Sequence, residues 1–386
     1  MKYTISIDWL SVFGILNLGT FKPAEEVWSA GASLSACIPL QYRYKKAAYG
    51  TRQFKELWDV FFPNSAGGWD AIASVQAVPC SPILPAGSCI VKFDNRVLYQ
   101  PDMWYSVTNF FDHHGIVVQN ISRIDICADF NAFASYKCVP FIADFVSSKL
   151  RHVGRGVGNA YFNHGTAADK ITRVSKYFLK YTGLSFGTHK SDARIYLYNK
   201  TFELTTQKEK PWIRDRWKNA GLITERVNPT TGEIEVVPVW RLEVSLKAKA
   251  LQFRDKSTGE NVQITAESVQ ADEEVSKIFH TFVRKLFAFV KNRDGITNIT
   301  REKRIVLFDD TPPIYDRGII RNVSASSRTE KILIRALWHL SERYRGRDMV
   351  EDEGVSKQLA DELASATNLD RWFHEKRFSW DNEFHK

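Results

Sequence analysis

Cysteine is scarce in this chain, and the few that occur follow no pattern. Five are found among the 386 residues: Cys37, Cys80, Cys89, Cys127 and Cys138. No two form a C-x-x-C pair, and none joins histidines at the spacing of a zinc site. An odd number of unpatterned cysteines gives no indication of a disulfide framework and fits a reducing, cytoplasmic location.

Long apolar runs are also missing. No stretch approaches the roughly 18 apolar residues that a membrane-spanning helix needs. The opening segment MKYTISIDWLSVFGIL alternates apolar and polar residues and is interrupted by Asp8, so we expect a strand there and no signal peptide. Hydrophobic residues still make up 44% of the chain, which excludes a largely disordered protein.

Positive charge and aromatic rings are plentiful. The formal net charge is +9, and 13% of the residues are aromatic. A basic protein suits a polyanion, either nucleic acid or an anionic membrane surface. Aromatic rings among cations favour single-stranded nucleic acid, because bases stack on the rings. The basic residues are dispersed and no lipidation motif occurs, so we expect no membrane partner.

The pattern of apolar residues changes about two thirds of the way along the chain. Before that point, strand-like and helical segments alternate. Beyond it, amphipathic helices are expected at 272–292, 329–346 and 355–368. The turn-rich segment RDKSTGENVQ lies between the two regions. We therefore expect a first domain at 1–260 and a mostly helical C-terminal region at 261–386.

Four strand-like segments each have one polar and one apolar face, because alternate side chains of a strand point to opposite sides. The polar faces consist of Arg123, Asp125, Cys127 and Asp129; of Arg194, Tyr196, Tyr198 and Lys200; of Arg241, Glu243, Ser245 and Lys247; and of Thr4, Ser6 and Asp8. Trp9 is expected on the apolar face of the first strand, with Ile5 and Ile7. An ordinary half-solvated sheet predicts the same alternation, but not these residue types.

The acids on these faces call for an explanation. Aspartate is a poor strand former, yet Asp125 and Asp129 share one short strand, and Asp8 and Glu243 lie on two others. If the strands are neighbours, the carboxylates converge, and they repel one another unless a cation lies among them. The residues alone leave two options open. One is a Mg²⁺ or Mn²⁺ site with carboxylate ligands; the other is a network of Asp–Arg pairs.

Two tyrosines share the polar face of RIYLYNK. A strand tyrosine is most often structural, and its hydroxyl is a weak nucleophile until it is activated. Lys200 and Arg194 on the same face could stabilise a phenolate and the charge of a pentacovalent phosphate. With a divalent ion on the phosphate, these groups suit a transesterification in which tyrosine replaces a DNA 3′-oxygen. The pattern does not separate Tyr196 from Tyr198.

The segments RIDICADF, SFGTHKSDARIYLYNKTFE and WRLEVSL, with IDWLSVFG near the start, resemble in order and spacing the trans-acting replication initiators of rolling-circle plasmids and filamentous-type phages. The motifs span about residues 5–250. The resemblance implies an α+β fold: a mainly antiparallel central sheet with helices on one face and a polar active-site face, plus a C-terminal helical region. It also implies a cytoplasmic enzyme that nicks one strand at its origin, forms a 5′-phosphotyrosyl intermediate and later rejoins the strand.

The resemblance also implies roles for individual residues. The tyrosine of Y-N-K is the nucleophile, which is Tyr198 here, with Tyr196 as the second candidate. Lys200 and Arg194 are expected to assist at the phosphate. The acids expected to bind Mg²⁺ or Mn²⁺ are Asp125, Asp129 and Glu243. Contacts with nucleic acid are expected from Arg123, Lys190, His189 and Arg241.

Histidine patterns separate this chain from many rolling-circle enzymes, which bind their metal through a His-hydrophobe-His motif. No convincing motif of this kind occurs here. His113 and His114 are adjacent, so a strand would send them to opposite sides, and we expect them at a helix end or in a loop. His189 is expected in a turn.

Two other functions stay open. One is a non-catalytic protein that binds single-stranded nucleic acid; the other is a metal-dependent nuclease that uses water and forms no covalent intermediate. The expected partners are origin DNA, single-stranded or cruciform at the nick site, and a host helicase. The basic C-terminal helices are expected to bind DNA or to form a homodimer.

Overall fold

The computed structural model describes most of the chain. The described residues are 1–17, 21, 42–153, 159–162, 183–188, 190–206, 209–227, 234–254, 261–293, 299–309, 314–315, 318–319, 332–339, 350–366, 369, 373–374 and 376. They belong to two compact units, Met1–Arg317 and Gly318–Lys386. The division predicted at 260/261 therefore falls inside the first unit.

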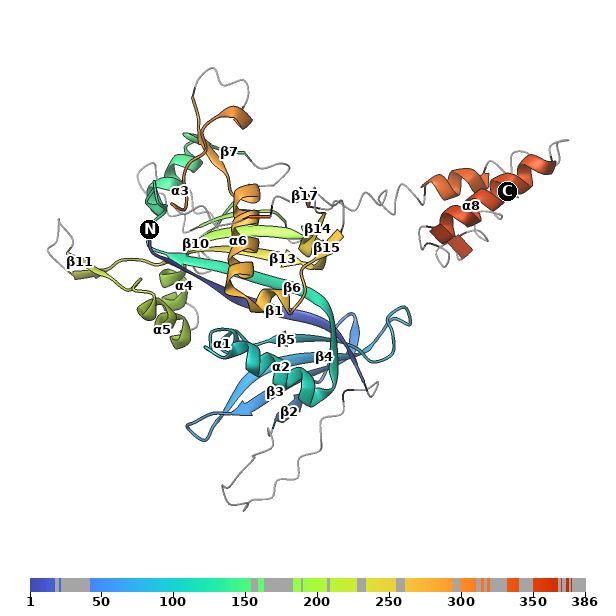
Figure 1. Ribbon diagram of the computed structural model, residues 1–386, viewed down its shortest axis with the longest axis horizontal. Helices are drawn as coiled ribbons and strands as arrows, with labels where there is room; N and C mark the ends of the chain where they lie inside the picture. The colour runs from blue at the N-terminus through green and yellow to red at the C-terminus, as the bar shows by residue number, and fades with distance from the viewer. Residues whose placement is uncertain are drawn as a thin grey trace, which may run out of the picture. The chain divides into compact units, whose positions relative to one another are not determined.

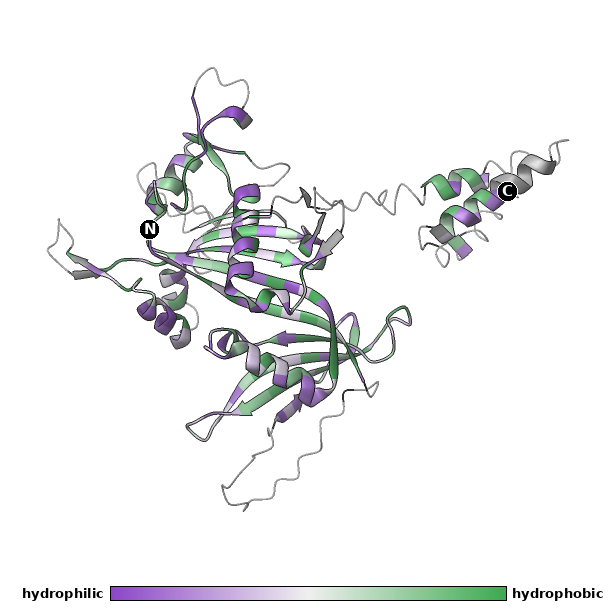
Figure 2. Ribbon diagram, viewed as in Figure 1, coloured by the Kyte–Doolittle hydropathy of each residue, from purple (hydrophilic) through white to green (hydrophobic). Residues whose placement is uncertain are grey.

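The first unit is built on an antiparallel sheet with ten strands among the described residues, in the order β2-β3-β4-β5-β1-β6-β13-β10-β9-β8 (Figure 1). These strands are β1 (Tyr3–Leu16), β2 (Arg43–Lys46), β3 (Phe54–Pro63), β4 (Trp69–Pro79), β5 (Ser88–Phe93), β6 (Ile116–Phe130), β8 (Asn159–Phe162), β9 (Gly183–Phe186), β10 (Ala193–Asn199) and β13 (Trp240–Lys247). Hydrophobic and polar residues alternate along them (Figure 2). The predicted α+β class with a mainly antiparallel sheet is confirmed.

The two longest strands, β1 and β6, join two halves of this sheet. They pair with each other along their length. On the other side of β1, β5 pairs only with residues 11–15, and on the other side of β6, β13 pairs only with residues 123–130. The half with β2–β5 is therefore offset from the half with β8–β10 and β13. Three register shifts between β1 and β6 allow the long strands to bend between the halves.

One of these shifts changes the face on which a side chain lies. Ile7 pairs with Ile126, whereas Trp9 pairs with Asp125, so Asp8 is the extra residue of a β-bulge. Trp9 therefore shares the polar face with Asp125. The prediction that Trp9 lies on the apolar face is wrong, because one extra residue reverses the alternation that follows it.

Helices cover the apolar face of the sheet. Helix α6 (Asp272–Leu286) lies across the half that contains β10 and β13 (Figure 1) and buries Ile278, Phe279 and Phe282 completely. Its apolar side packs on β1, β6, β10 and β13, which is why it belongs to the first unit and not to a separate helical region. Helix α2 (Met103–His114) covers the other half and buries Phe110 against Phe93.

His113 and His114 are the last two residues of helix α2. A helix end was one of the two placements expected from the sequence. One His114 ring nitrogen is 2.8 Å from the Phe110 carbonyl oxygen, and the other is 2.8 Å from the Tyr44 hydroxyl. Burial lowers the pKa of His114 to about 4. These contacts fix the helix to strand β2, so His114 is structural.

The remaining elements are short. Four helices are α1 (Asn95–Leu98), α3 (Cys138–Val146), α4 (Lys200–Thr206) and α5 (Pro211–Asn219). Three further strand pairs are β7 (Leu150–His152) with β16 (Phe289–Lys291), β11 (Glu225–Val227) with β12 (Ile234–Val236), and β14 (Gln252–Arg254) with β15 (Asn261–Gln263). The 3₁₀ turns are η2 (Ala248–Leu251), η3 (Ser268–Gln270) and η4 (Ile299–Arg301).

The second unit contains β17 (Gly318–Ile319), a helix at 332–339 and α8 (Val350–Ala366). Its described core consists of Ile334, Trp338, Ala360, Ala364 and Phe373. In the described part of the chain, none of the helices is both long and apolar enough to cross a bilayer.

Candidate active site

The three strands that carry the sequence motifs lie side by side. Strand β13 pairs with β6 on one side and with β10 on the other. The register places Arg241 between Asp129 and Tyr198, and Glu243 between Cys127 and Tyr196. Since the apolar residues of these strands pack under α6, the polar residues project from the opposite face. The sequence predicted that the polar residues would converge if these strands were neighbours, and the strands are neighbours.

The Tyr198 hydroxyl is the centre of a short hydrogen-bond chain. It donates to Glu243 Oε2 at 2.8 Å, and it accepts from Lys200 Nζ at 3.4 Å. The tyrosine is 7% exposed. Burial raises the pKa of Tyr198 well above its ordinary value, and the negative charge of Glu243 raises it further. The phenol therefore keeps its proton at neutral pH unless a neighbour accepts it.

Glu243 is the neighbour that can accept this proton. Burial, followed by the charges of Asp8 and Asp125, raises the pKa of Glu243 from 4.5 to about 7. At neutral pH such a carboxyl group is divided between its protonated and ionised forms. This division suits a group that takes up a proton in one step and returns it in another.

Lys200 lies where β10 ends and α4 begins. It is 1% exposed, and its ammonium group pairs with Glu203 at 2.6 Å. The sequence placed this residue on the face of the strand, whereas it starts a helix. The ammonium is nevertheless 5.3 Å from the centre of the Tyr198 ring. A buried cation this close to a phenol favours the phenolate form.

Arg241 is the centre of a second, deeper group. Its Nε and Nη2 donate to the two oxygens of Asp129 at 2.7 Å each, and Nη2 also donates to the Tyr99 hydroxyl at 2.8 Å. A further nitrogen pairs with Asp8. The residue is completely buried. The prediction that Arg241 contacts nucleic acid is wrong, because its guanidinium group is enclosed by these partners.

Three members of the Arg241 group were not found from the sequence. The Tyr99 hydroxyl donates to Asp8 Oδ1 at 2.7 Å, Asn95 donates to the same oxygen at 3.0 Å, and the Trp217 indole donates to Asp129 at 2.7 Å. Trp217 could have been assigned to a buried helix face from its spacing with other apolar residues of α5. No sequence pattern connects any of the three with a carboxylate on a distant strand.

The acids predicted to bind a divalent ion are spread along the sheet. Asp125 and Asp129 are four residues apart in β6, about 13 Å at a strand rise of roughly 3.3 Å per residue. Asp129 is held by Arg241, and Asp125 accepts from Arg123 Nε at 2.9 Å. Among the described residues, no three His, Cys, Asp or Glu side chains are grouped so that they could hold a metal ion. The Asp–Arg network is the arrangement found, and these acids do not fit a shared metal ion.

Tyr196, the second candidate nucleophile, has different surroundings. It is half-buried, and the Arg194 guanidinium lies 4.2 Å from the centre of its ring. Arg194 also donates to the Ser185 hydroxyl at 3.3 Å. Lys190 is exposed at the approach to β10, and His189 lies outside the described residues. The buried base and the buried cation thus converge on Tyr198.

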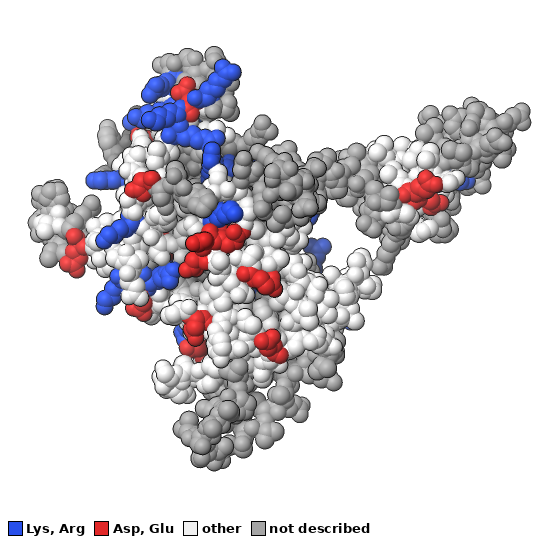
Figure 3. Space-filling model, viewed as in Figure 1, with Lys and Arg blue, Asp and Glu red and all other residues white. Residues whose placement is uncertain are grey.

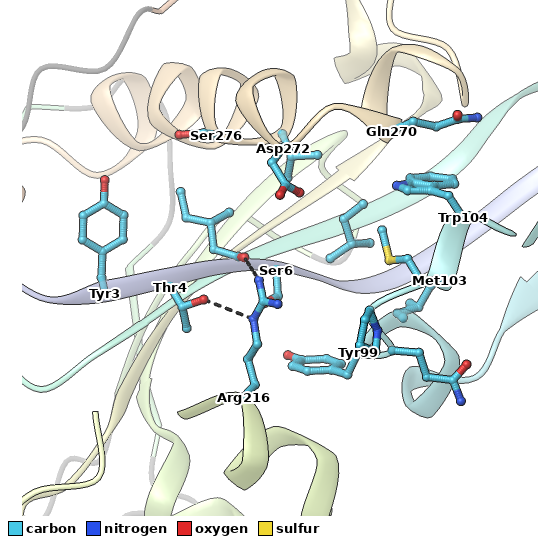
Figure 4. A pocket seen from close by; sticks show the side chains of 16 residues that line it. Tyr3, Thr4, Ser6, Tyr99, Met103, Trp104, Arg216, Gln270, Asp272 and Ser276 are labelled. Atoms are coloured by element: carbon cyan, nitrogen blue, oxygen red, sulfur yellow. Dashed lines mark hydrogen bonds between the residues drawn. The ribbon is translucent and has the colours of Figure 1, made fainter. Parts of the chain in front are cut away.

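A pocket of about 580 Å³ lies beside the Arg241 group, along the edge of β1 (Figure 4). Residues 3–7 of β1 border this pocket because β5 does not extend along them. Arg216 of α5 donates to the Thr4 hydroxyl and to the Ile5 carbonyl at 3.3 Å each. Tyr99 also lines the pocket, so its ring forms a wall shared with the buried network.

Lys and Arg side chains gather at the end of the first unit that carries α3 and β7 (Figure 3). The exposed basic residues near β7 and β16 in this part of the chain are Lys149, Arg151, Lys291, Arg293, Arg301, Lys303 and Arg304. This basic end includes Lys291 of the segment 272–292, one of the basic C-terminal helices expected to bind DNA or to form a dimer. Its role in binding DNA stays a prediction.

No family model and no curated protein matches this chain. Among solved structures, the chain is similar to the rolling circle replication initiator protein from Geobacillus stearothermophilus, with 11% sequence identity and a TM-score of 0.40. The similarity covers 78% of this chain and 92% of that chain. At this level of similarity the site itself has to carry any functional conclusion.

Proposed function

We propose that the chain is a DNA nicking-closing enzyme that initiates rolling-circle replication, with Tyr198 as its nucleophile. The observation that supports this most is the 2.8 Å hydrogen bond from the Tyr198 hydroxyl to Glu243, a carboxyl group whose pKa is about 7. A structural tyrosine needs one hydrogen-bond partner of any kind. Here a base tuned to neutral pH and a buried ammonium group both converge on the hydroxyl.

In the proposed reaction, Glu243 takes the proton of Tyr198 while the phenol oxygen attacks a phosphorus atom of the DNA strand. The bond from tyrosine oxygen to phosphorus forms, and the bond from phosphorus to the 3′-oxygen breaks. The 3′-oxygen leaves with a proton from water, and the strand stays attached through its 5′-phosphate. Lys200 stabilises the negative charge on the phenol oxygen as it develops.

Strand closure is the reverse of this reaction. The free 3′-hydroxyl gives its proton back to the hydroxide left from that water as its oxygen attacks the phosphotyrosine. The bond from the 3′-oxygen to phosphorus forms, the bond from phosphorus to the tyrosine oxygen breaks, and Glu243 returns its proton to the departing Tyr198. One phosphoester replaces another, so no nucleotide triphosphate is needed. We assign no step to a metal ion, since Asp125 and Asp129 are each held by an arginine and Glu243 accepts the Tyr198 hydrogen bond. Origin DNA as substrate, a host helicase as partner and cytoplasmic localisation belong to the same proposal.

The test uses a pool of single-stranded oligonucleotides of random sequence, labelled at the 3′ end, and the full chain with Mg²⁺ or Mn²⁺. The 3′ fragment keeps the 5′-phosphate, so the label should appear on the protein in a denaturing gel. We expect the adduct to form with the wild-type protein and with Tyr196→Phe, but not with Tyr198→Phe.

The other outcomes identify the alternatives. Cleavage without an adduct would indicate a nuclease that uses water. Binding without cleavage would indicate a non-catalytic protein that binds single strands. Loss of the adduct only with Tyr196→Phe would keep the reaction and move the nucleophile by two residues.

A further inference from the structure

The polar face of the sheet carries a row of cations and aromatic rings beyond the groups that act in the proposed reaction. The row consists of Lys92 on β5, Trp9 on β1, Arg123 on β6, and Tyr196 and Arg194 on β10. Lys92 Nζ lies 3.7 Å from the centre of the Trp9 ring, and the Arg123 guanidinium lies 4.5 Å from it. Trp9 is available to this row only because the bulge at Asp8 brings it to the polar face.

The strand register makes the row continuous. Ser11, two residues beyond Trp9 on β1, pairs with Lys92 on one side and with Arg123 on the other. Tyr196 is close enough to Arg123 for each to affect the pKa of the other. From β5 to β10 the row crosses four strand intervals, about 19 Å at roughly 4.8 Å each. It ends on the strand that carries Tyr198.

The row is accessible and positively charged. Its members are half-buried, and the Arg123 side chain is 39% exposed. Of the three cations of the row, Arg123 binds its strand neighbour Asp125. Single-stranded nucleic acid suits such a surface, because its phosphates pair with cations while its bases stack on rings. An acidic peptide would satisfy the charges alone.

We propose that this row is the path along which the single DNA strand reaches Tyr198, with bases on Trp9 and Tyr196 and phosphates on Lys92, Arg123 and Arg194. This inference rests on the proposed function and names the residues that hold the substrate. A cation over a ring and a base over a ring use the same π-face. When a base takes that place, the displaced cation lies beside the phosphate of the same nucleotide.

The test measures binding by fluorescence anisotropy with the full chain. One probe is a labelled oligothymidylate of about 20 nucleotides, longer than the 4–16 nucleotides of a typical single-strand site. The other is an abasic strand with the same number of phosphates. Trp9→Ala should weaken binding of the oligothymidylate roughly tenfold, the size expected for one lost base stack. It should leave binding of the abasic strand within about twofold.

Trp58→Ala is the matched control. Trp58 is also a half-buried strand tryptophan with a lysine above its ring, Lys46 at 5.0 Å. It packs near Phe21, which is stacked on His114 of α2, so it lies on the covered face. We expect the Trp58→Ala variant to bind the oligothymidylate and the abasic strand like the wild type. A second variant, Lys92→Gln, should reduce the slope of log binding constant against log salt by about one, the value for one lost phosphate contact.

Several outcomes would overturn the path. Trp9→Ala could weaken binding of the oligothymidylate and of the abasic strand equally, or it could weaken binding of neither. The dependence of binding on salt could also be the same for Lys92→Gln as for the wild type. Polyglutamate that competes as well as the oligothymidylate would indicate an acidic protein as the occupant. The Lys92 variant keeps the test decisive if Trp9→Ala does not fold.

The same experiments separate this inference from the proposed function. Tyr198→Phe should bind both strands like the wild type although it forms no adduct. Base-dependent binding without any adduct in the wild type would contradict the nicking reaction alone. A normal adduct with binding that ignores Trp9 would contradict the path alone.

Discussion

Two groups on the same face of one sheet differ in what they are built to do. In the Arg241 group, every guanidinium donor named above meets a carboxylate or a hydroxyl, and the arginine is fully buried. In the Tyr198 group, a phenol shares its proton with Glu243 beside a single ammonium. The motif residues therefore divide into one set that holds the strands together and another that is arranged for chemistry.

The pKa values of two acids show how this division arises. Burial would raise the pKa of Asp8, but the charges of Arg241 and Lys200 outweigh it, and the pKa lies below its ordinary range. Burial also raises the pKa of Glu243, and there the charge of Asp8 adds to the effect. The structural group therefore keeps Asp8 ionised, and the ionised Asp8 helps to make Glu243 basic.

The largest effect is expected from Glu243→Gln. The amide can still accept the Tyr198 hydrogen bond but cannot take the proton, so the rate of adduct formation should fall by roughly two to four orders of magnitude. In the wild type, the rate should rise with pH through about 7 as Glu243 loses its proton. Single-turnover assays across pH check both points. A rise near pH 7 that persists in the variant would mean that another group is the base.

The next largest effect is expected from Arg241→Leu, in stability. It leaves two buried carboxylates, Asp8 and Asp129, without their counter-charge, which should cost about 3–5 kcal/mol in free energy of unfolding. The matched control is Arg123→Leu, which removes a partly exposed guanidinium from one buried carboxylate, Asp125, and should therefore cost less than Arg241→Leu. Urea denaturation at pH 7 compares the two. Equal losses would contradict the division into a structural and a reactive group.

A smaller effect is expected in the pH dependence of stability. The pKa of Glu243 is raised, so its contribution is fully present below about pH 4.5 and is lost as pH rises through about 7. Between pH 5 and 8 the wild type should therefore lose roughly 1–3 kcal/mol relative to Glu243→Gln. Denaturation of both proteins at each pH gives this difference. A constant difference would show that Glu243 titrates normally.

The smallest effect is expected from Asp8→Asn, which joins the two groups. Removal of its negative charge should lower the pKa of Glu243, so the rise in rate near pH 7 should shift to lower pH by up to about one unit. The pH–rate profile of the variant is the measurement. A profile that does not move would show that the groups act independently.

The sequence was informative wherever strand alternation held. Arg241, Glu243 and Asp129 were assigned to polar faces, and the structure places them there, because a regular strand has a period of two. The same rule failed at Trp9, since a bulge of one residue leaves no mark in the residue pattern. It also failed at Lys200, where the strand passes directly into a helix.

The domain division and the membership of the Arg241 group could not be predicted either, and the reasons differ from those for the strands. An amphipathic helix such as α6 shows that it packs against something, but not that its partner is a sheet formed by residues far earlier in the chain. Tyr99 and Trp217 reach their carboxylates across long sequence separations. For the acids, the sequence allowed either a divalent metal site or a network of Asp–Arg pairs. The choice depends on where the arginines lie in space, which the sequence does not show.

The identity of the attacking residue is the central claim, and direct mapping tests it best. The adduct trapped on the wild-type protein would be digested with nuclease and protease, and the modified peptide identified by mass spectrometry. We predict a nucleotide phosphate attached to Tyr198. Attachment at Tyr196, or at no tyrosine, would contradict the assignment of the Tyr198–Glu243 pair as the reactive group.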